Sequence, residues 1–300
     1  MVDLRPVGPE DWAAIAALHG RNTPAFMAER AVDIRCELAA VLFGGIVGYV
    51  SVSRMPWWGP GRFQARVLVD RALWGQGAGR RLASAALASA EANGAARLDS
   101  SVAEGDPRSL RFAERWGFRV ERHLFGSSLD VAAFDEAPFA GVVDRVTAAG
   151  IRFFTMAEAG DTPEARAKLW ALNRAVSLDI PGRERTFATL EDYIKRNCEA
   201  PWYRPGAQLI AAEGDRWVGL CSLQPLEDGS LFNRVTGVVP QARGRSLATA
   251  LKVLGVRYAR AHGFVLMRTN NDAANAPMLA INRKLGFVPA PGLYLLQRDL

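Results

Sequence analysis

The sequence predicts an α/β protein of two tandem domains, each a mixed (α+β-type) sheet with helices on its faces. One reason is length, because 300 residues are more than a single hydrophobic core usually fills. The other is a repeated glycine-containing turn, which begins at Gly75 and again at Gly244. Each turn is followed 42 residues later by a Gly-Phe pair, at Gly117 and Gly286. The matched spacing indicates a duplicated module.

The first copy follows the order β-α-β-β-β-α-β-α-β when its apolar periodicity is traced along the chain. Gly44-Gly45 is typical of a hairpin turn, and Gly94 is typical of the residue that follows a helix. The expected elements are strands at 4–6, 38–43, 46–53, 63–69, 96–102 and from 118, and helices at 9–20, 79–93 and 107–116.

The second copy repeats this order from Ile151. Its expected elements are strands at 151–156, 208–213, 216–223 and 231–239, and helices at 163–176 and 247–262. From Arg152 to Gly244 there are 92 residues, whereas 70 separate Arg5 from Gly75. The extra length falls at 177–206, and insertions gather in loops that carry specificity. We therefore expect this segment to cover a substrate pocket, and we expect domains at 1–143 and 150–300.

Composition places the chain among ordinary soluble globular proteins, with 49% hydrophobic and 23% charged residues. The three cysteines and three histidines are scattered, which argues against a disulfide framework and a metal site. No leader peptide and no apolar run of membrane-spanning length are evident, so we expect a cytoplasmic protein without a membrane partner. The net charge of +6 is spread along the chain without interleaved aromatics, which disfavours a nucleic-acid partner.

The repeated turn has a physical use. A glycine turn that opens a helix leaves backbone N–H groups free at the positive end of the helix dipole, where they bind anions. An ordinary helix start is the alternative interpretation for one such turn. Two turns with matched downstream spacing favour a phosphate-binding function.

With these features the chain resembles the GNAT superfamily of N-acetyltransferases, as two tandem GNAT-type domains. Val239-Pro-Gln-Ala-Arg243-Gly-Arg-Ser-Leu-Ala248 matches the family's turn for the pyrophosphate of acetyl-coenzyme A. The stretch from Asn275 through Asn282 to Gly286-Phe287 matches the family's Asn…Tyr…Gly-Phe pattern. Within the superfamily, the second copy looks most like the two-domain members that include mycothiol synthase.

The resemblance implies acetyl-CoA as cofactor, with both turns and the strands before them as its binding residues. The turns would hold the pyrophosphate, and the pantetheine would lie in a gap between two splayed strands. In the second copy the implied residues are Val238, Val239, Arg243, Gly244, Arg245, Ser246, Leu247, Ala248, Thr249 and Asn275. In the first copy they are Leu68, Val69, Trp74, Gly75, Gln76, Gly77, Ala78, Gly79 and Arg80.

The first copy keeps the glycines of the turn but departs from the family pattern in its side chains. Trp74 stands at the Arg/Gln position and Arg71 at the usual proline. On its last helix, Asp106 and Ala113 stand where the pattern has Asn and Tyr.

The second copy keeps Pro240, Arg243 and Asn275, but Ser246 replaces a glycine and Asn282 replaces the tyrosine. Ser246 still donates its N–H if its φ is negative. Side chains thus favour the second copy and backbone favours the first, and we expect the second to be the better coenzyme site.

The catalytic candidates are Asn282, which the resemblance places near the sulfur, and Glu213 as general base. Asparagine has no titratable proton, so Asn282 cannot replace the tyrosine as an acid. Other carboxylates within the two copies are Glu227, Asp272, Asp99 and Glu104. Aromatic residues that either line an acceptor pocket or belong to the core are Trp57, Trp58, Trp170, Trp202 and Tyr203.

The expected function is acetyl transfer from acetyl-CoA to a primary amine of a small molecule, by direct attack in a ternary complex. The expected assembly is a monomer or a homodimer. One alternative is a mycothiol-synthase-like acceptor, a cysteinyl amino-sugar. Another is a non-catalytic acyl-CoA-binding or sensing module, because the tyrosine is missing from both copies.

Overall fold

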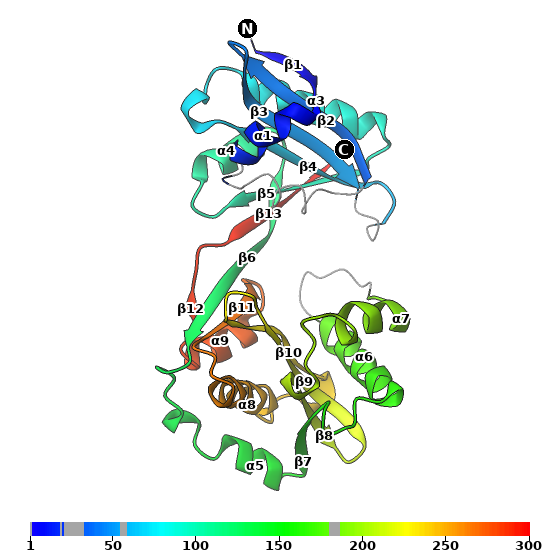
Figure 1. Ribbon diagram of the computed structural model, residues 1–300, viewed down its shortest axis with the longest axis vertical. Coiled ribbons are helices and arrows are strands. Elements are labelled where there is room, and N and C mark those ends of the chain that lie inside the picture. Colours follow the sequence, from blue (N-terminus) through cyan, green and yellow to red (C-terminus); the bar gives the residue numbers. More distant parts are fainter. Residues whose placement is uncertain (1, 19, 21–32, 55–58, 180–186) are drawn as a thin grey trace. The chain divides into compact units, whose positions relative to one another are not determined.

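The computed structural model describes residues 2–18, 20, 33–54, 59–179 and 187–300. It forms two compact units: Met1–Glu121 together with Leu293–Leu300, and Arg122–Gly292. Each is a mixed sheet flanked by helices, so the predicted α/β class is confirmed (Figure 1). Within the described residues no helix has the length and apolar character needed to cross a membrane.

The N-terminal unit has the strand order β1-β2-β3-β4-β5-β13. Strands β4 and β5 are parallel, and the other pairs are antiparallel. Its elements are β1 (Asp3–Pro6), α1 (Trp12–Leu18), β2 (Asp33–Leu42), β3 (Gly45–Arg54), β4 (Arg62–Val69), α3 (Ala78–Ala92), β5 (Arg97–Ala103), α4 (Pro107–Arg115) and β13 (Leu293–Asp299).

The C-terminal unit has the order β6-β11-β10-β9-β8-β7, and the short β12 (Val288–Pro289) also pairs with β6. Its other elements are β6 (Arg119–Asp130), α5 (Val142–Ala148), β7 (Ile151–Thr155), α6 (Pro163–Ser177), α7 (Leu190–Tyr193), the π-helical η4 (Ile194–Cys198), β8 (Gln208–Glu213), β9 (Arg216–Pro225), β10 (Leu231–Val238), α8 (Leu247–Ala261), β11 (Leu266–Asp272) and α9 (Ala276–Lys284).

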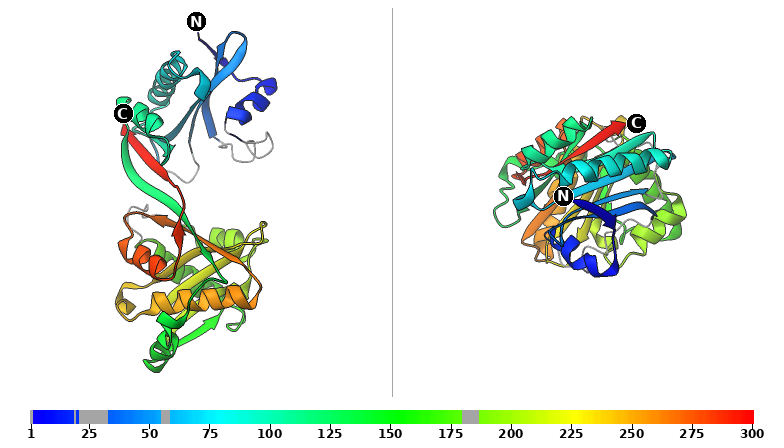
Figure 2. Two further views of the ribbon diagram at one scale, coloured as in Figure 1. Left: turned by 90° about the vertical axis from the view of Figure 1, so that its left-hand side faces the viewer. Right: turned by 90° about the horizontal axis from the view of Figure 1, so that it is seen from above.

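Helices cover both faces of each sheet, because successive strand residues point to opposite sides. On β3, Tyr49 packs with Ile15 of α1, whereas the adjacent Val50 packs in the cluster that contains Leu82 of α3. Figure 2 shows α1 and α3 on opposite sides of these strands. In the C-terminal unit, α6 and α8 cover the two faces in the same way.

The glycines predicted to follow the two long helices do so. Gly94 and Gly263 have φ of +72° and +74°, in the left-handed region that favours glycine. Both predicted hairpins are also confirmed, since β2 pairs with β3 and β8 pairs with β9.

The last strands of the two copies are exchanged. In the N-terminal unit, β13 pairs with β5 and places Leu293 opposite Ala103. In the C-terminal unit, β6 pairs with β11 and places Leu124 opposite Asp272. These four residues are related by the same 169-residue offset as the two turns, so the two pairings have an identical register.

The expected contiguous halves, 1–143 and 150–300, therefore differ from the compact units. Residues 122–143 lie in the C-terminal unit, and 293–300 complete the N-terminal sheet. The physical reason is that equivalent strands carry equivalent patterns, so each fits the other copy's sheet edge.

Candidate active site

The turn of the N-terminal unit connects β4 to α3, and its glycines adopt left-handed backbone conformations. Gly75 and Gly77 have φ of +94° and +90°. Gly77 is the N-cap of α3, and among the described residues no side-chain hydrogen bond caps the start of that helix. The N–H groups at the start of α3 are therefore available to an anion.

Strands β4 and β5 separate just before this turn. Their parallel pairing covers only three positions and ends with Gln64 opposite Asp99. Strand β4 continues to Val69 and β5 to Ala103. Residues 65–69 thus have no partner on β5, and the splayed gap implied by the family resemblance is confirmed.

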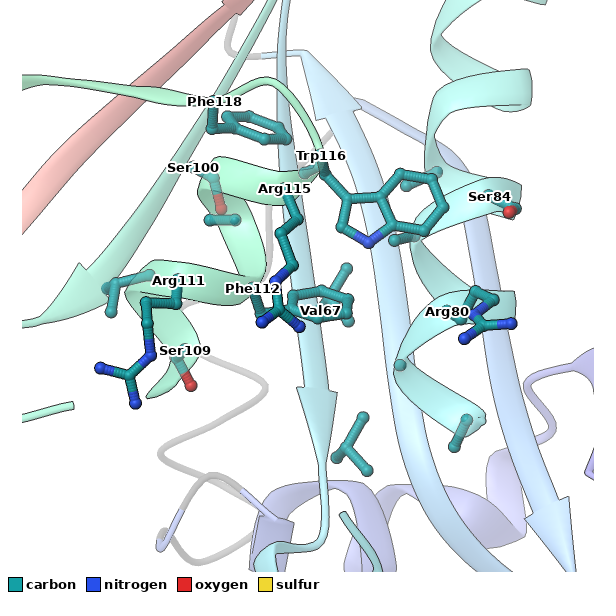
Figure 3. A pocket seen from close by; sticks show the side chains of 18 of the residues that line it. Val67, Arg80, Ser84, Ser100, Ser109, Arg111, Phe112, Arg115, Trp116 and Phe118 are labelled. Carbon is teal, nitrogen blue, oxygen red and sulfur yellow. The ribbon is translucent and has the colours of Figure 1, made fainter. Parts of the chain in front are cut away.

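A cavity of about 820 Å³ opens at this gap. That volume is in the range of small-molecule and cofactor sites. Apolar side chains such as Val67, Phe112 and Phe118 form its inner wall, and Trp116 lies between α4 and α3 (Figure 3). Of the expected coenzyme residues, those that line it are Val69, Trp74, Gly75, Gly77, Ala78, Gly79 and Arg80.

Four arginines also line the cavity: Arg80 on α3, and Arg108, Arg111 and Arg115 on α4. Figure 3 shows Arg80 on one helix and Arg115 on the other bordering the space between the two helices. None of the four forms an ion pair with a carboxylate in the described part of the chain. Their positive charges therefore favour an anionic ligand.

The three α4 arginines were missed in the sequence, although their spacing was a usable signal. Positions i, i+3 and i+7 lie on one face of a helix, and this face looks into the cavity.

The turn of the C-terminal unit follows the same course. Gly244 has φ of +75°, and Ser246, the N-cap of α8, has φ of +61°. The condition of a negative φ at Ser246 is therefore not met. The serine takes the left-handed conformation of its counterpart Gly77, at a cost of about 1–2 kcal/mol.

The two arginines of this second turn are already paired with carboxylates. Arg243 forms an ion pair with Asp179, and an Arg245 nitrogen lies 2.9 Å from Glu213. Hydrogen bonds from Arg216 and Arg245 hold the pKa of Glu213 below its usual value. Two arginines thus hold Glu213 ionised and lower its basicity, which makes it a weaker general base.

The gap of the C-terminal unit contains buried polar side chains where the N-terminal unit has its cavity. Strands β10 and β11 also pair at only three positions. Lys252, at the position of Ala83, donates from Nζ to Asn233 Oδ1 over 2.8 Å. Thr236, at the position of Val67, donates to the same oxygen over 2.9 Å. Burial lowers the pKa of Lys252 to about 8.

Asn282 belongs to a second network in this gap. It is 4% exposed, and its Nδ2 donates to Asn271 Oδ1 over 2.7 Å. Asn271 in turn donates to Ser127 Oγ over 2.7 Å. Ala113 and Val102, which hold the positions of Asn282 and Asn271 in the first copy, line the open cavity instead.

Most of the remaining candidates cap a helix or pack in the core. The side chain of Asn275 caps α9 through the Met278 N–H, as Asp106 caps α4 through Ser109. Leu68 packs in the cluster of α1 and Tyr49. In the second copy, the core includes Val238 and Leu247, and Val239 and Ala248 pack against it. Thr249 of the same copy is half-buried, whereas Gln76 of the first copy is exposed.

Two of the other candidate carboxylates, Asp99 and Asp272, are also paired. Asp99 binds both Arg62 and Arg97, and an Asp272 oxygen lies 2.7 Å from Arg122.

The aromatic candidates of the second copy belong to its core. Trp170, Trp202 and Tyr203 pack with α6, and Tyr203 donates to Asp161 over 2.9 Å. Trp57 and Trp58 lie outside the described residues, as does part of the 177–206 insertion.

Comparison with known proteins agrees with this geometry. The family model "Acetyltransferase (GNAT) family" matches residues 12–118, which contain the turn and the cavity. A mycothiol acetyltransferase from Clavibacter michiganensis subsp. michiganensis is 32% identical over 235 residues, covering 76% of this chain and 70% of that protein. The chain belongs to the GNAT family of acetyltransferases. The family resemblance, the enzyme class and acetyl-CoA as acetyl donor are thereby confirmed.

Other relatives extend the similarity. A mycothiol acetyltransferase from Frankia alni is 31% identical over 71% of this chain, which spans 64% of that relative's length. A GCN5-related N-acetyltransferase from Sphaerobacter thermophilus aligns with 99% of this chain and 95% of its own, with a TM-score of 0.70 and 19% identity. A tandem GNAT protein from the clavulanic acid biosynthesis pathway aligns with 100% and 98%, with a TM-score of 0.65. These structures confirm the tandem GNAT fold.

Proposed function

We propose that this GNAT-family acetyltransferase binds acetyl-CoA in the cavity of its N-terminal unit and acetylates a primary amine of a small molecule. The observation that carries the proposal is the cavity at the splayed β4–β5 gap, bounded by a glycine turn and four arginines without carboxylate partners among the described residues. The equivalent gap of the C-terminal unit holds hydrogen-bonded polar side chains.

The chain's own groups account for binding. The N–H groups of the Gly75–Arg80 turn, together with nearby arginines, hold the diphosphate. The unpaired edge of β4 at 65–69 receives the pantetheine as an added strand. A backbone N–H on this edge polarises the carbonyl as an oxyanion-hole donor does. Acetyl-CoA supplies the acyl group, which the amine attacks directly.

The assignment reverses the preference for the second copy that its side chains suggested. Arg243 and Arg245 match the family pattern, but each already has an anionic partner. A new anion would have to displace Asp179 and Glu213. We propose one coenzyme site per chain.

Calorimetric titration with acetyl-CoA tests this stoichiometry, and release of free thiol with a panel of amines tests turnover. We expect one equivalent bound per chain and amine-dependent thiol release. Two equivalents of similar affinity would contradict the single site. Binding without thiol release across the panel would favour the acyl-CoA-sensing alternative.

A second candidate acceptor is a mycothiol-type compound, a cysteinyl amino-sugar. The names of the relatives from Clavibacter and Frankia favour it. The panel should therefore pair such a compound with its amino-sugar part alone. A preference of at least tenfold in kcat/KM for the cysteinyl compound would support this acceptor.

A further inference from the structure

Trp74 and Arg243 stand at equivalent positions of the two turns and make equivalent hydrogen bonds. The indole Nε1 of Trp74 donates to the Val69 carbonyl over 3.0 Å. The Nε of Arg243 donates to the Val238 carbonyl over 3.1 Å. Val69 and Val238 are themselves equivalent. Trp74 thus replaces the bracing hydrogen bond of the arginine but not its charge.

Two arginines beside Trp74 supply positive charge instead. The Arg108 guanidinium carbon lies 4.6 Å from the centre of the Trp74 ring, and that of Arg71 lies 5.7 Å away. A guanidinium at such a distance from an indole face is attracted by the ring. The second copy, which has its arginine within the turn, carries Pro277 and Pro240 at these two positions.

The two flanking arginines differ in their availability. Arg71 lies 3.3 Å from a carboxylate oxygen of Asp106. Arg108 lines the cavity and has no ion pair with any described carboxylate. Arg108 also lies in the first turn of α4 and extends from there to the start of the glycine turn. Its stacking on Trp74 restrains the guanidinium, which reduces the entropy lost when a ligand binds.

We propose that Arg108, positioned by the face of Trp74, binds the diphosphate of the coenzyme and so takes the role of the missing turn arginine. The inference rests on the proposed coenzyme site of the N-terminal unit. It assigns a binding role to a residue outside the turn and a positioning role to Trp74.

The test is Arg108→Gln, with affinity measured for CoA, dephospho-CoA and pantetheine. A charged hydrogen bond to phosphate is worth roughly a tenfold to hundredfold change in affinity. We expect a loss of that size for CoA and for dephospho-CoA, which keeps the diphosphate. We expect less than a twofold change for pantetheine, which has no phosphate.

Rescue provides a second, independent readout. In the Arg108→Gln background, Trp74→Arg returns a cation to the turn, and we expect it to recover at least fivefold of the lost affinity for CoA. Arg35→Gln, at an arginine paired with Asp33 and outside the cavity, is the matched control and should leave all three affinities unchanged. Melting temperatures of the variants within two degrees of the parent would show that they remain folded.

Unchanged affinity for CoA in Arg108→Gln would overturn the proposal. A loss for CoA that vanishes with dephospho-CoA would also overturn it, since the ligand would then be the 3′-phosphate. Gly77→Val separates this failure from that of the proposed function. If Gly77→Val weakens CoA while Arg108→Gln does not, only the role of Arg108 fails; if neither does, the coenzyme site itself is misplaced.

Discussion

Asn282 donates a hydrogen bond to Asn271 and thereby joins α9 to β11 in the C-terminal unit. The same positions in the N-terminal unit are Ala113 and Val102, and both line the cavity. This pair of substitutions is one of the differences between the closed gap and the open one, beside Lys252 and Thr236 at the positions of Ala83 and Val67. The contrast makes both copies testable by exchange of single residues.

Asn282→Ala should destabilise the protein without weakening coenzyme binding. The change leaves a buried Asn271 oxygen without its donor, which costs about 1–3 kcal/mol. Urea unfolding measures the loss, and calorimetry measures affinity. The reciprocal Ala113→Asn should weaken acetyl-CoA binding, because it places a polar group in the cavity. A loss of affinity in Asn282→Ala would instead locate the coenzyme in the C-terminal unit.

The turn glycines form a matched pair. A Cβ at either Gly77 or Gly244 would have no atom within 4 Å, so any effect of valine comes from backbone conformation. Both residues have a positive φ that a β-branched residue strongly disfavours. We expect Gly77→Val to reduce acetyl-CoA affinity at least tenfold and Gly244→Val to leave it within twofold. The reverse result would assign the site to the second copy.

Lys252 predicts a pH-dependent contribution to stability. Burial lowers its pKa to about 8 from the usual value of 10.5, so the unfolded chain binds one more proton than the folded chain between these pH values. Stability is therefore highest above pH 10.5 and falls progressively as pH drops from 10.5 to 8. Relative to Lys252→Met, the wild type should gain up to about 3 kcal/mol between pH 8 and 10.5. A constant difference across that range, measured by urea unfolding, would show that Lys252 is not desolvated.

Removal of the last eight residues, 293–300, should act on the N-terminal sheet. These residues form β13, whose partner β5 would become an unpaired edge. We expect faster hydrogen exchange at Arg97–Ala103 and weaker acetyl-CoA binding, with little change at Leu266–Asp272 in β11. Faster exchange confined to β11 would mean that each copy pairs with its own last strand.

Much of the fold could be predicted from the sequence, because a fixed offset relates many elements of the first copy to elements of the second. The offset that relates Gly94 to Gly263 also relates β4 to β10 and α3 to α8. The strand exchange could not be predicted, because β6 and β13 have equivalent patterns and either would satisfy either edge. Only the three-dimensional path of the chain decides between them.

The site was predicted in part. The positions of the two glycine turns followed from the sequence, but the carboxylate partners of the second copy's arginines did not. Arg243 matches the family motif, yet its charge is already paired with Asp179, 64 residues earlier in the chain. Trp74 breaks the motif, yet the guanidinium of Arg108 lies over its ring from another helix. Such long-range charge pairing leaves no periodic signal in a single sequence.

The exchange of last strands also sets the order in which the chain is completed. N-terminal domains usually fold first as they leave the ribosome. Here the sheet of the N-terminal unit includes β13, which follows the whole C-terminal unit in the sequence. That sheet therefore stays one strand short until the C-terminal unit has been synthesised, and a premature stop anywhere before Leu293 yields a chain whose N-terminal sheet is unfinished.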